Sequence, residues 1–136
     1  MATGISWTDE TWNPLVGCSR ITEGCDHCYA IGAVARGEKL GTVQHVGLTA
    51  KPDSDEWSGP AGTEPDRLDW TGEVRAVPHL LDAWIGKTKP RRIFVNSLSD
   101  LFHADALKLT LPDGPNVPYV AQIVARMVAS SQHQYQ

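Results

Sequence analysis

The feature that most constrains this chain is the placement of its cysteines: all three, Cys18, Cys25 and Cys28, fall within one window of eleven residues. An odd number of cysteines in so short a stretch argues against a disulfide framework. Thiolates are soft ligands that suit zinc and iron–sulfur clusters. Three thiolates on one loop, with no fourth cysteine in the sequence, therefore predict a metal site that keeps one position for a non-protein ligand.

The number of available ligands favours a cluster over zinc. Cys25 and Cys28 are two residues apart, so both can bind one metal centre from a single turn. Cys28 begins a predicted helix, whose dipole favours the thiolate there. A closed zinc site needs a fourth protein ligand. His27 is poorly placed beside Cys28, and His45 or His103 would serve only if the fold brought one of them close. Thiols without a metal are the third alternative.

Composition and charge exclude several classes of protein. The chain has 136 residues, is 41% hydrophobic and carries a net charge of -4, as expected for a single soluble domain without a general attraction to nucleic acid or anionic membranes. It has no apolar run of the roughly 20 residues that span a membrane, and its first residues do not resemble a secretory signal. We therefore expect a cytoplasmic protein with reduced thiols.

The final residues 131–136 resemble the start of a strand, so we expect the domain, residues 1–136, to be incomplete.

Hydrophobic periodicity predicts alternating strands and helices. The predicted order is strand 11–16, helix 28–37, strand 72–77, helix 78–86, strand 91–96, helix 116–131, and a strand starting within 131–136. Asn116 is the predicted cap of the last helix, and Pro118 fits its first turn. Such alternation indicates parallel strands covered by helices. We expect an α/β fold, either an open sheet or a partial (β/α) barrel of about three βα units plus the start of a fourth strand. Residues 38–71, rich in Pro, Gly and Asp, are predicted to form a long surface insertion.

Two loops are expected to meet at one rim of this fold, because sites in parallel α/β folds form at the carboxyl ends of strands. The cysteine loop follows the first strand, and residues 96–103 follow the third. The second segment carries five side chains that can hold a polar ligand beside the metal, namely Asn96, Ser97, Ser99, Asp100 and His103. The alternative is that these groups only satisfy nearby backbone donors.

A basic stretch lies just before the third predicted strand. Its four cations are Lys87, Lys89, Arg91 and Arg92. They fall at the amino end of that strand, opposite the predicted rim. In an acidic chain we expect a solvated run of charge here rather than a phosphate site.

Three motifs in order resemble a known family. Residues 7–18 (Trp-Thr-Asp-Glu-Thr-Trp-Asn-Pro-Leu-Val-Gly-Cys), 24–30 (Gly-Cys-Asp-His-Cys-Tyr-Ala) and 90–103 (Pro-Arg-Arg-Ile-Phe-Val-Asn-Ser-Leu-Ser-Asp-Leu-Phe-His) are similar to the phage three-Cys-motif proteins. These are radical-SAM-like proteins of unknown function from bacteriophages and bacteria. The resemblance runs from Trp7 to Gln136, apart from the insertion, and implies a C-terminally truncated member with a barrel of the radical-SAM type.

The resemblance also implies a cofactor and a reaction. Cys18, Cys25 and Cys28 would hold a 4Fe–4S cluster whose open iron binds S-adenosylmethionine. Electron transfer would cleave this molecule to methionine and a 5′-deoxyadenosyl radical, which abstracts hydrogen from an unknown substrate. Two departures from the usual radical-SAM sequence pattern weaken the expectation that S-adenosylmethionine is cleaved. The first two cysteines are separated by six residues rather than the three that are usual in radical-SAM proteins, and no Gly-Gly-Glu stretch ends the second strand. Cluster binding is therefore better supported than cleavage of S-adenosylmethionine.

The partners implied are equally broad. By fold-level analogy the substrate is a nucleic-acid base or a translation-related target. The reaction needs a reductant protein, and a partner protein encoded nearby is a further expectation. If the chain is phage-encoded, its location is the host-cell cytoplasm. The alternatives are a zinc-binding, non-catalytic interaction module and an inert truncated phage protein.

Overall fold

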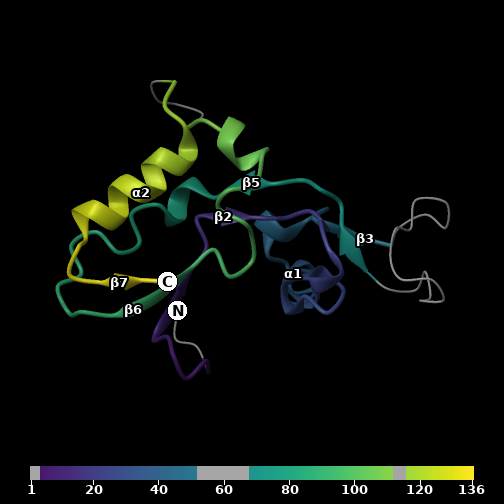
Figure 1. Ribbon diagram of the computed structural model, residues 1–136, viewed down its shortest axis with the longest axis horizontal. Helices are drawn as coiled ribbons and strands as arrows, with labels where there is room; N and C mark the ends of the chain where they lie inside the picture. The colour runs from purple at the N-terminus through teal and green to yellow at the C-terminus, as the bar shows by residue number, and fades with distance from the viewer. Residues whose placement is uncertain (1–3, 52–67, 112–115) are drawn as a thin grey trace.

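The computed structural model describes residues 4–51, 68–111 and 116–136, which form a mixed α/β fold (Figure 1). Within them lie two α-helices, α1 (Tyr29–Lys39) and α2 (Tyr119–Ala129), and three small sheets. The predicted α/β class is confirmed, and the strands of the described residues do not close into a barrel. No helix in these three segments is long and apolar enough to cross a membrane.

The largest sheet is parallel and has the strand order β1-β6-β7. Its strands are β1 (Glu10–Trp12), β6 (Arg92–Val95) and β7 (Gln134–Tyr135). Thr11 lies opposite Phe94, and Ile93 lies opposite Tyr135. Three predicted strands, including the one near the C-terminal end of the sequence, are therefore confirmed as parallel neighbours.

The predicted strand 11–16 is too long, and the predicted strand 72–77 pairs in the wrong direction for a parallel sheet. Proline has no N–H to donate to a ladder, and the strand breaks before Pro14. The chain resumes as β2 (Leu15–Val16), which pairs antiparallel with β5 (Arg75–Ala76) instead of extending the parallel sheet. The Val77 N–H also donates to the Pro14 carbonyl at 2.8 Å. Residues 72–77 therefore form half of a separate two-stranded sheet.

Two helix predictions also need correction. Residues 78–86 form a short 3-10 turn, η3 (Pro78–Leu80), followed by further turns. This segment is tied to β1 because the Trp12 indole N–H donates to the Leu80 carbonyl at 2.7 Å. Helix α2 begins at Tyr119 with Pro118 in the capping position, not Asn116. The Tyr119 N–H instead donates to the Leu109 carbonyl at 2.7 Å. Of the three predicted helices, two are present as the α-helices α1 and α2, and residues 78–86 are not helical beyond the short turn η3.

The predicted insertion is structured at both ends. Its first residues complete α1, and a 3-10 turn, η2 (Val43–His45), follows. The strands β3 (Thr49–Ala50) and β4 (Asp69–Trp70) then pair antiparallel. Residues 52–67 of the insertion lie outside the described residues. The part that is described thus forms a hairpin base beside α1.

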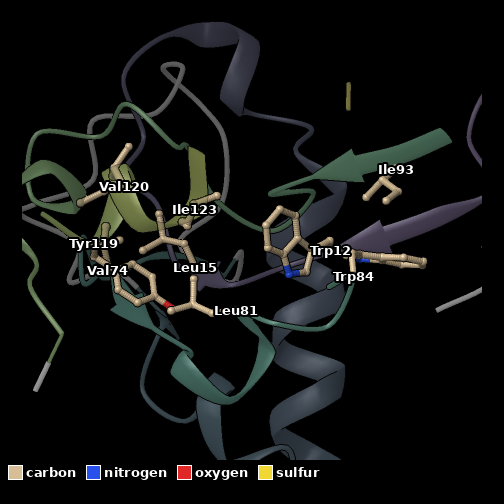
Figure 2. Close-up of a cluster of buried hydrophobic side chains, with 10 residues drawn as sticks. Trp12, Leu15, Val74, Leu81, Trp84, Ile93, Tyr119, Val120 and Ile123 are labelled. Atoms are coloured by element: carbon tan, nitrogen blue, oxygen red, sulfur yellow. The ribbon is translucent and has the colours of Figure 1, made fainter. Parts of the chain in front are cut away.

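The core consists of two separate clusters. The larger joins the parallel sheet to α2 (Figure 2) and contains Trp12, Leu15, Val74, Leu81, Trp84, Ile93, Ala106, Tyr119, Val120 and Ile123. Within it the Tyr119 hydroxyl donates to the Pro14 carbonyl at 2.8 Å. The smaller contains Val16, Val34, Leu48 and Val77, and it joins α1 to β2. Accordingly, α2 lies beside β7, whereas α1 lies near β2 and β3 at the other end of the molecule (Figure 1).

Candidate metal and ligand site

The cysteine loop, residues 17–28, lies against the segment 96–103, as the parallel-strand rule predicts. The Gly17 N–H donates to the Leu98 carbonyl at 3.1 Å, and Gly17 forms a parallel bridge with Ser99. The Ser99 hydroxyl donates to the Leu15 carbonyl at 2.9 Å. Gly17 has a φ of 96°, and a Cβ there would overlap the Glu73 carbonyl oxygen. Only glycine fits this approach, so the loop begins at a fixed point on the rim.

A second contact joins the loop to the rim at His103. The buried imidazole accepts a hydrogen bond at Nδ1 from the Asp105 N–H at 3.1 Å. In the neutral ring Nε2 then carries the proton, and it donates to the Ser19 hydroxyl at 2.8 Å. Ser19 follows Cys18 directly. His103 is therefore held beside the first cysteine, although both of its ring nitrogens are already hydrogen-bonded.

The other two histidines considered as zinc ligands, His27 and His45, occupy different places. His27 is exposed on the loop next to Cys28. His45 is buried against Gly37, where a Cβ would overlap its ring, and burial lowers its pKa. Gly37 lies nine residues beyond Cys28, the N-cap of α1, which is about 13 Å along a helix axis. His45 is thus far from the loop, and of these three histidines His103 is the one hydrogen-bonded to Ser19, the residue after Cys18.

The three thiols are free, partly buried and electrostatically unequal. Burial raises the pKa of Cys18, and the Asp100 carboxylate and the other two thiols raise it further. Hydrogen bonds with the backbone of Ile21 and Thr22 lower the pKa of Cys25. Cys28 stands at the N-cap of α1, as predicted. All three thiols belong to the one loop of residues 17–28, and each is partly exposed.

The thiols do not meet at one point in this conformation. In residues 4–51, 68–111 and 116–136, no three Cys, His, Asp or Glu side chains are arranged as ligands of one metal ion. The loop therefore carries a donor set of the right kind for a soft metal centre. Binding such a centre through all three thiols requires the loop to close.

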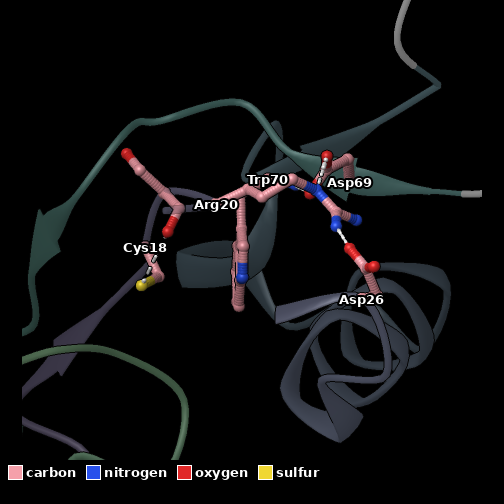
Figure 3. A network of polar contacts seen from close by, with 6 residues as sticks. Cys18, Arg20, Asp26, Asp69 and Trp70 are labelled. Atoms are coloured by element: carbon pink, nitrogen blue, oxygen red, sulfur yellow. Dashed lines mark hydrogen bonds and ion pairs between the residues drawn. The ribbon is translucent and has the colours of Figure 1, made fainter. Parts of the chain in front are cut away.

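Arg20 holds the loop in its present shape (Figure 3). Its Nε donates to the Asp69 carboxylate of β4 at 2.6 Å, and its Nη1 pairs with Asp26 of the loop. The side chains are only 10–13% exposed. Sequence reasoning missed this residue, although Arg20 is the only arginine or lysine within the cysteine window. Its partner Asp69 lies 49 residues away, so no local pattern could identify the pair.

Asn96 is the most unusual residue of the rim. It ends β6 with a φ of 57°, the one positive φ among described residues other than glycine. Its side chain is 7% exposed, and neither its Nδ2 nor its Oδ1 has a hydrogen-bond partner in the described structure. Buried amides are nearly always paired, and an unpaired one costs about 1–3 kcal/mol. A polar ligand with both a donor and an acceptor would satisfy this amide.

Asn96 also lines a hollow of about 510 Å³ at the carboxyl ends of β6 and β7. Ser99 and Asp100 line it as well, together with apolar groups of Phe102 and Met127. Thus three of the five predicted ligand-binding residues come together in one place. Asp100 also accepts the Phe102 N–H at 2.9 Å, a local turn contact of the kind that the alternative interpretation expects.

The other two predicted residues connect elements instead. Ser97 donates its hydroxyl to the Asn13 side-chain carbonyl at 3.1 Å. The Ser97 carbonyl accepts the Tyr29 hydroxyl of α1 at 2.8 Å. His103 binds Ser19, as described above. Ser97 and His103 therefore tie the rim to α1 and to the cysteine loop rather than line the hollow.

Comparison with known proteins gives one match. A family model described as "Protein of unknown function (DUF5131)" matches residues 2–136. Neither the curated proteins nor the solved structures contain a match to this chain. Since the family model covers nearly the whole sequence, the chain belongs to the DUF5131 family.

Proposed function

We propose that this chain is a radical-SAM-like iron–sulfur protein, related to the phage three-Cys-motif proteins, with a partial (β/α) barrel built on β1, β6 and β7. Cys18, Cys25 and Cys28 hold the cluster, and the Asn96 hollow holds a polar part of S-adenosylmethionine. One observation carries the proposal: three free thiols and an unpaired buried amide lie on adjacent loops at the carboxyl edge of a parallel sheet.

The donor set supports a cluster in kind. Three thiolates leave one iron of a 4Fe–4S cluster for a non-protein ligand, and the chain has no fourth cysteine. When bound, the cluster would supply the electron for reductive cleavage of S-adenosylmethionine. Hydrogen bonds with the backbone favour the thiolate at Cys25, which is the form that binds a metal. Burial and the neighbouring carboxylate disfavour it at Cys18, and a bound cation would offset both effects.

The rim residues supply polar groups that suit such a ligand. The Asn96 amide presents both a donor and an acceptor, and these match the amino and carboxylate groups of an amino acid. Asp100 lies close enough to Cys18 to raise its pKa, and its negative charge attracts an ammonium or sulfonium group. His103 and Ser19 hold the loop against the rim. In this proposal the substrate is a nucleic-acid base or a translation-related target, and a reductant protein and a partner encoded nearby complete the system.

The decisive experiment is anaerobic reconstitution with iron and sulfide, followed by incubation with S-adenosylmethionine and a reductant. We expect a brown protein that yields 5′-deoxyadenosine. The Cys25→Ser variant, handled in the same way, should lose both the colour and the product. A colourless protein that retains stoichiometric zinc through the reconstitution would contradict the proposal.

A zinc-binding interaction module is the second candidate, favoured by the position of His103 next to Ser19 and Cys18. A site of three cysteines and one histidine is a closed, structural zinc site. The His103→Gln variant separates the two candidates. Zinc content should fall if His103 is the fourth ligand, whereas an iron–sulfur cluster held by the cysteines alone should remain bound.

A further inference from the structure

The amino edge of the parallel sheet carries a second hollow, of about 570 Å³, which the proposed function does not use. The turn of residues 86–91 forms most of its wall, and Trp84 and Glu10 complete it. We refer to it as the amino-edge hollow. Glu10 begins β1, and Arg91 immediately precedes β6. Because parallel strands place their two ends at opposite edges, this hollow lies across the sheet from the cysteine loop.

We propose that the amino-edge hollow binds the phosphate group of a ligand. Lys87, Lys89 and Arg91 line it and contribute three positive charges, against one negative charge from Glu10. The whole chain, by contrast, has a net charge of -4. A concave surface whose charges are mostly positive attracts an anion more strongly than isolated surface cations do. The basic stretch thus lines a hollow, and Lys87 and Lys89 are exposed there to an incoming ligand.

The three cations are available to an anion. In the described part of the chain, no ion pair involves Lys87, Lys89 or Arg91. The neighbouring Arg92 differs, because its guanidinium donates to Asp9 at 2.9 Å. Arg binds phosphate through its planar fork of donors, and Lys binds it as a point charge. Thr88, which also lines the hollow, adds a hydroxyl donor.

The turn that carries these cations is fixed at both ends. The Gln132 side-chain amide donates to the Lys87 carbonyl at 2.6 Å. The Gln134 N–H donates to the Arg91 carbonyl at 2.8 Å. The Lys87 ammonium also lies 4.5 Å from the centroid of the buried Trp84 ring, within range of a cation–π interaction. A backbone ordered in advance loses less freedom when an anion binds.

The test is isothermal titration calorimetry of the full chain with inorganic pyrophosphate. We expect saturable binding that weakens at least about tenfold in Lys89→Glu and in Arg91→Glu. Lys108→Glu is the matched control, because it makes the same change in net charge at an exposed lysine that pairs with Asp105. It should bind like the wild type. The proposal is overturned if the wild type does not bind at millimolar pyrophosphate, or if Lys108→Glu weakens binding equally.

A second titration, with a short single-stranded oligonucleotide, identifies the source of the phosphate. Tighter binding than to pyrophosphate, with a log–log salt slope of about -2 for three contacts, would assign the hollow to a nucleic-acid backbone. Equal or weaker binding would assign it to a small phosphate ester. Arg91→Lys keeps the charge but loses the planar fork, so it should weaken binding less than Arg91→Glu does. Thermal melts confirm that each variant is folded. Cys25→Ser should bind pyrophosphate normally, so this inference stands or falls independently of the cluster.

Discussion

The half of the molecule around α2, here called the sheet half, and the cysteine loop are stabilised in different ways. Around α2 the side chains of Ile93, Tyr119 and Ile123 are completely buried in one apolar cluster. The cysteine loop has no buried residue in its 3-10 turn, Glu23–Cys25, and Arg20 holds its shape by ion pairs. Apolar packing resists any displacement, whereas polar contacts can be exchanged for water or for a ligand. The sheet half is therefore a framework, and the loop is the part that can rearrange.

This contrast suits a loop that must close around a metal centre. Regions with few buried apolar contacts open at a lower free energy than the global unfolding of the domain. Binding residues are often found on such loops, supported by a rigid scaffold. Here the loop is anchored at Gly17 and at Ser19 while its cysteines remain partly exposed. Four predictions test whether the sheet half and the cysteine loop differ in this way.

The largest effect is expected in the core beneath α2. Ile123→Ala removes a fully buried side chain, and we expect the free energy of unfolding to fall by about 2–5 kcal/mol. Chemical denaturation monitored by circular dichroism measures it. Val128→Ala on the same helix is the control, because Val128 is 72% exposed, and its effect should stay within about 0.5 kcal/mol. Equal effects would show that α2 is not packed as described.

Arg20→Met tests the loop. It removes the cation between the Asp26 and Asp69 carboxylates, which are nearly buried, and we expect a local loss of about 1–3 kcal/mol. Hydrogen exchange read by mass spectrometry should rise in residues 17–28 while exchange in α2 stays unchanged.

Arg75→Met is the matched control for that experiment. Its partner Glu73 is half exposed, so the loss should stay below about 1 kcal/mol. If Arg20→Met accelerates exchange throughout the protein, the loop does not open independently of the framework.

A smaller effect of opposite sign is expected at Asn96. Glycine tolerates its positive φ and removes the unpaired amide, so Asn96→Gly should raise the stability of the ligand-free protein by about 1 kcal/mol. Ser97→Ala removes a hydroxyl that is hydrogen-bonded to Asn13 and should lower it by a similar amount. Thermal melts compare the two variants. A clear loss in Asn96→Gly would mean that the amide stabilises the fold and is not kept for a ligand.

The smallest effect belongs to an exposed ion pair of the sheet half. Hydrogen bonds from Arg92 lower the pKa of Asp9 from 3.8 to about 2. Since the folded-state pKa is lowered, this stabilisation is present above pH 3.8 and is lost as the pH falls toward 2. Asp9→Asn should therefore show a shallower loss of stability over this interval in acid-denaturation curves. Parallel curves for the two proteins would exclude the contribution.

Local patterns predicted some elements well. The helix α2, the strand β6 and the helix after Cys28 were predicted from the spacing of their apolar residues. These predictions succeeded because such spacing depends only on residues that are near one another in the sequence. The meeting of the cysteine loop with residues 96–103 followed from the rule that parallel strands share a carboxyl edge. The antiparallel pairing of β2 with β5 did not follow, because it depends on the chain turning at Pro14 and meeting Val77.

The sequence by itself determined the chemistry available to this protein: three thiols on one loop, a polar segment after an apolar strand, and a basic stretch before it. The tertiary structure decided how that chemistry is arranged. It paired Arg20 with Asp69 and left Asn96 buried without a partner. It also bent the basic stretch around a hollow. The physical reason is that side-chain identity is local, whereas burial and pairing depend on which distant segments come into contact.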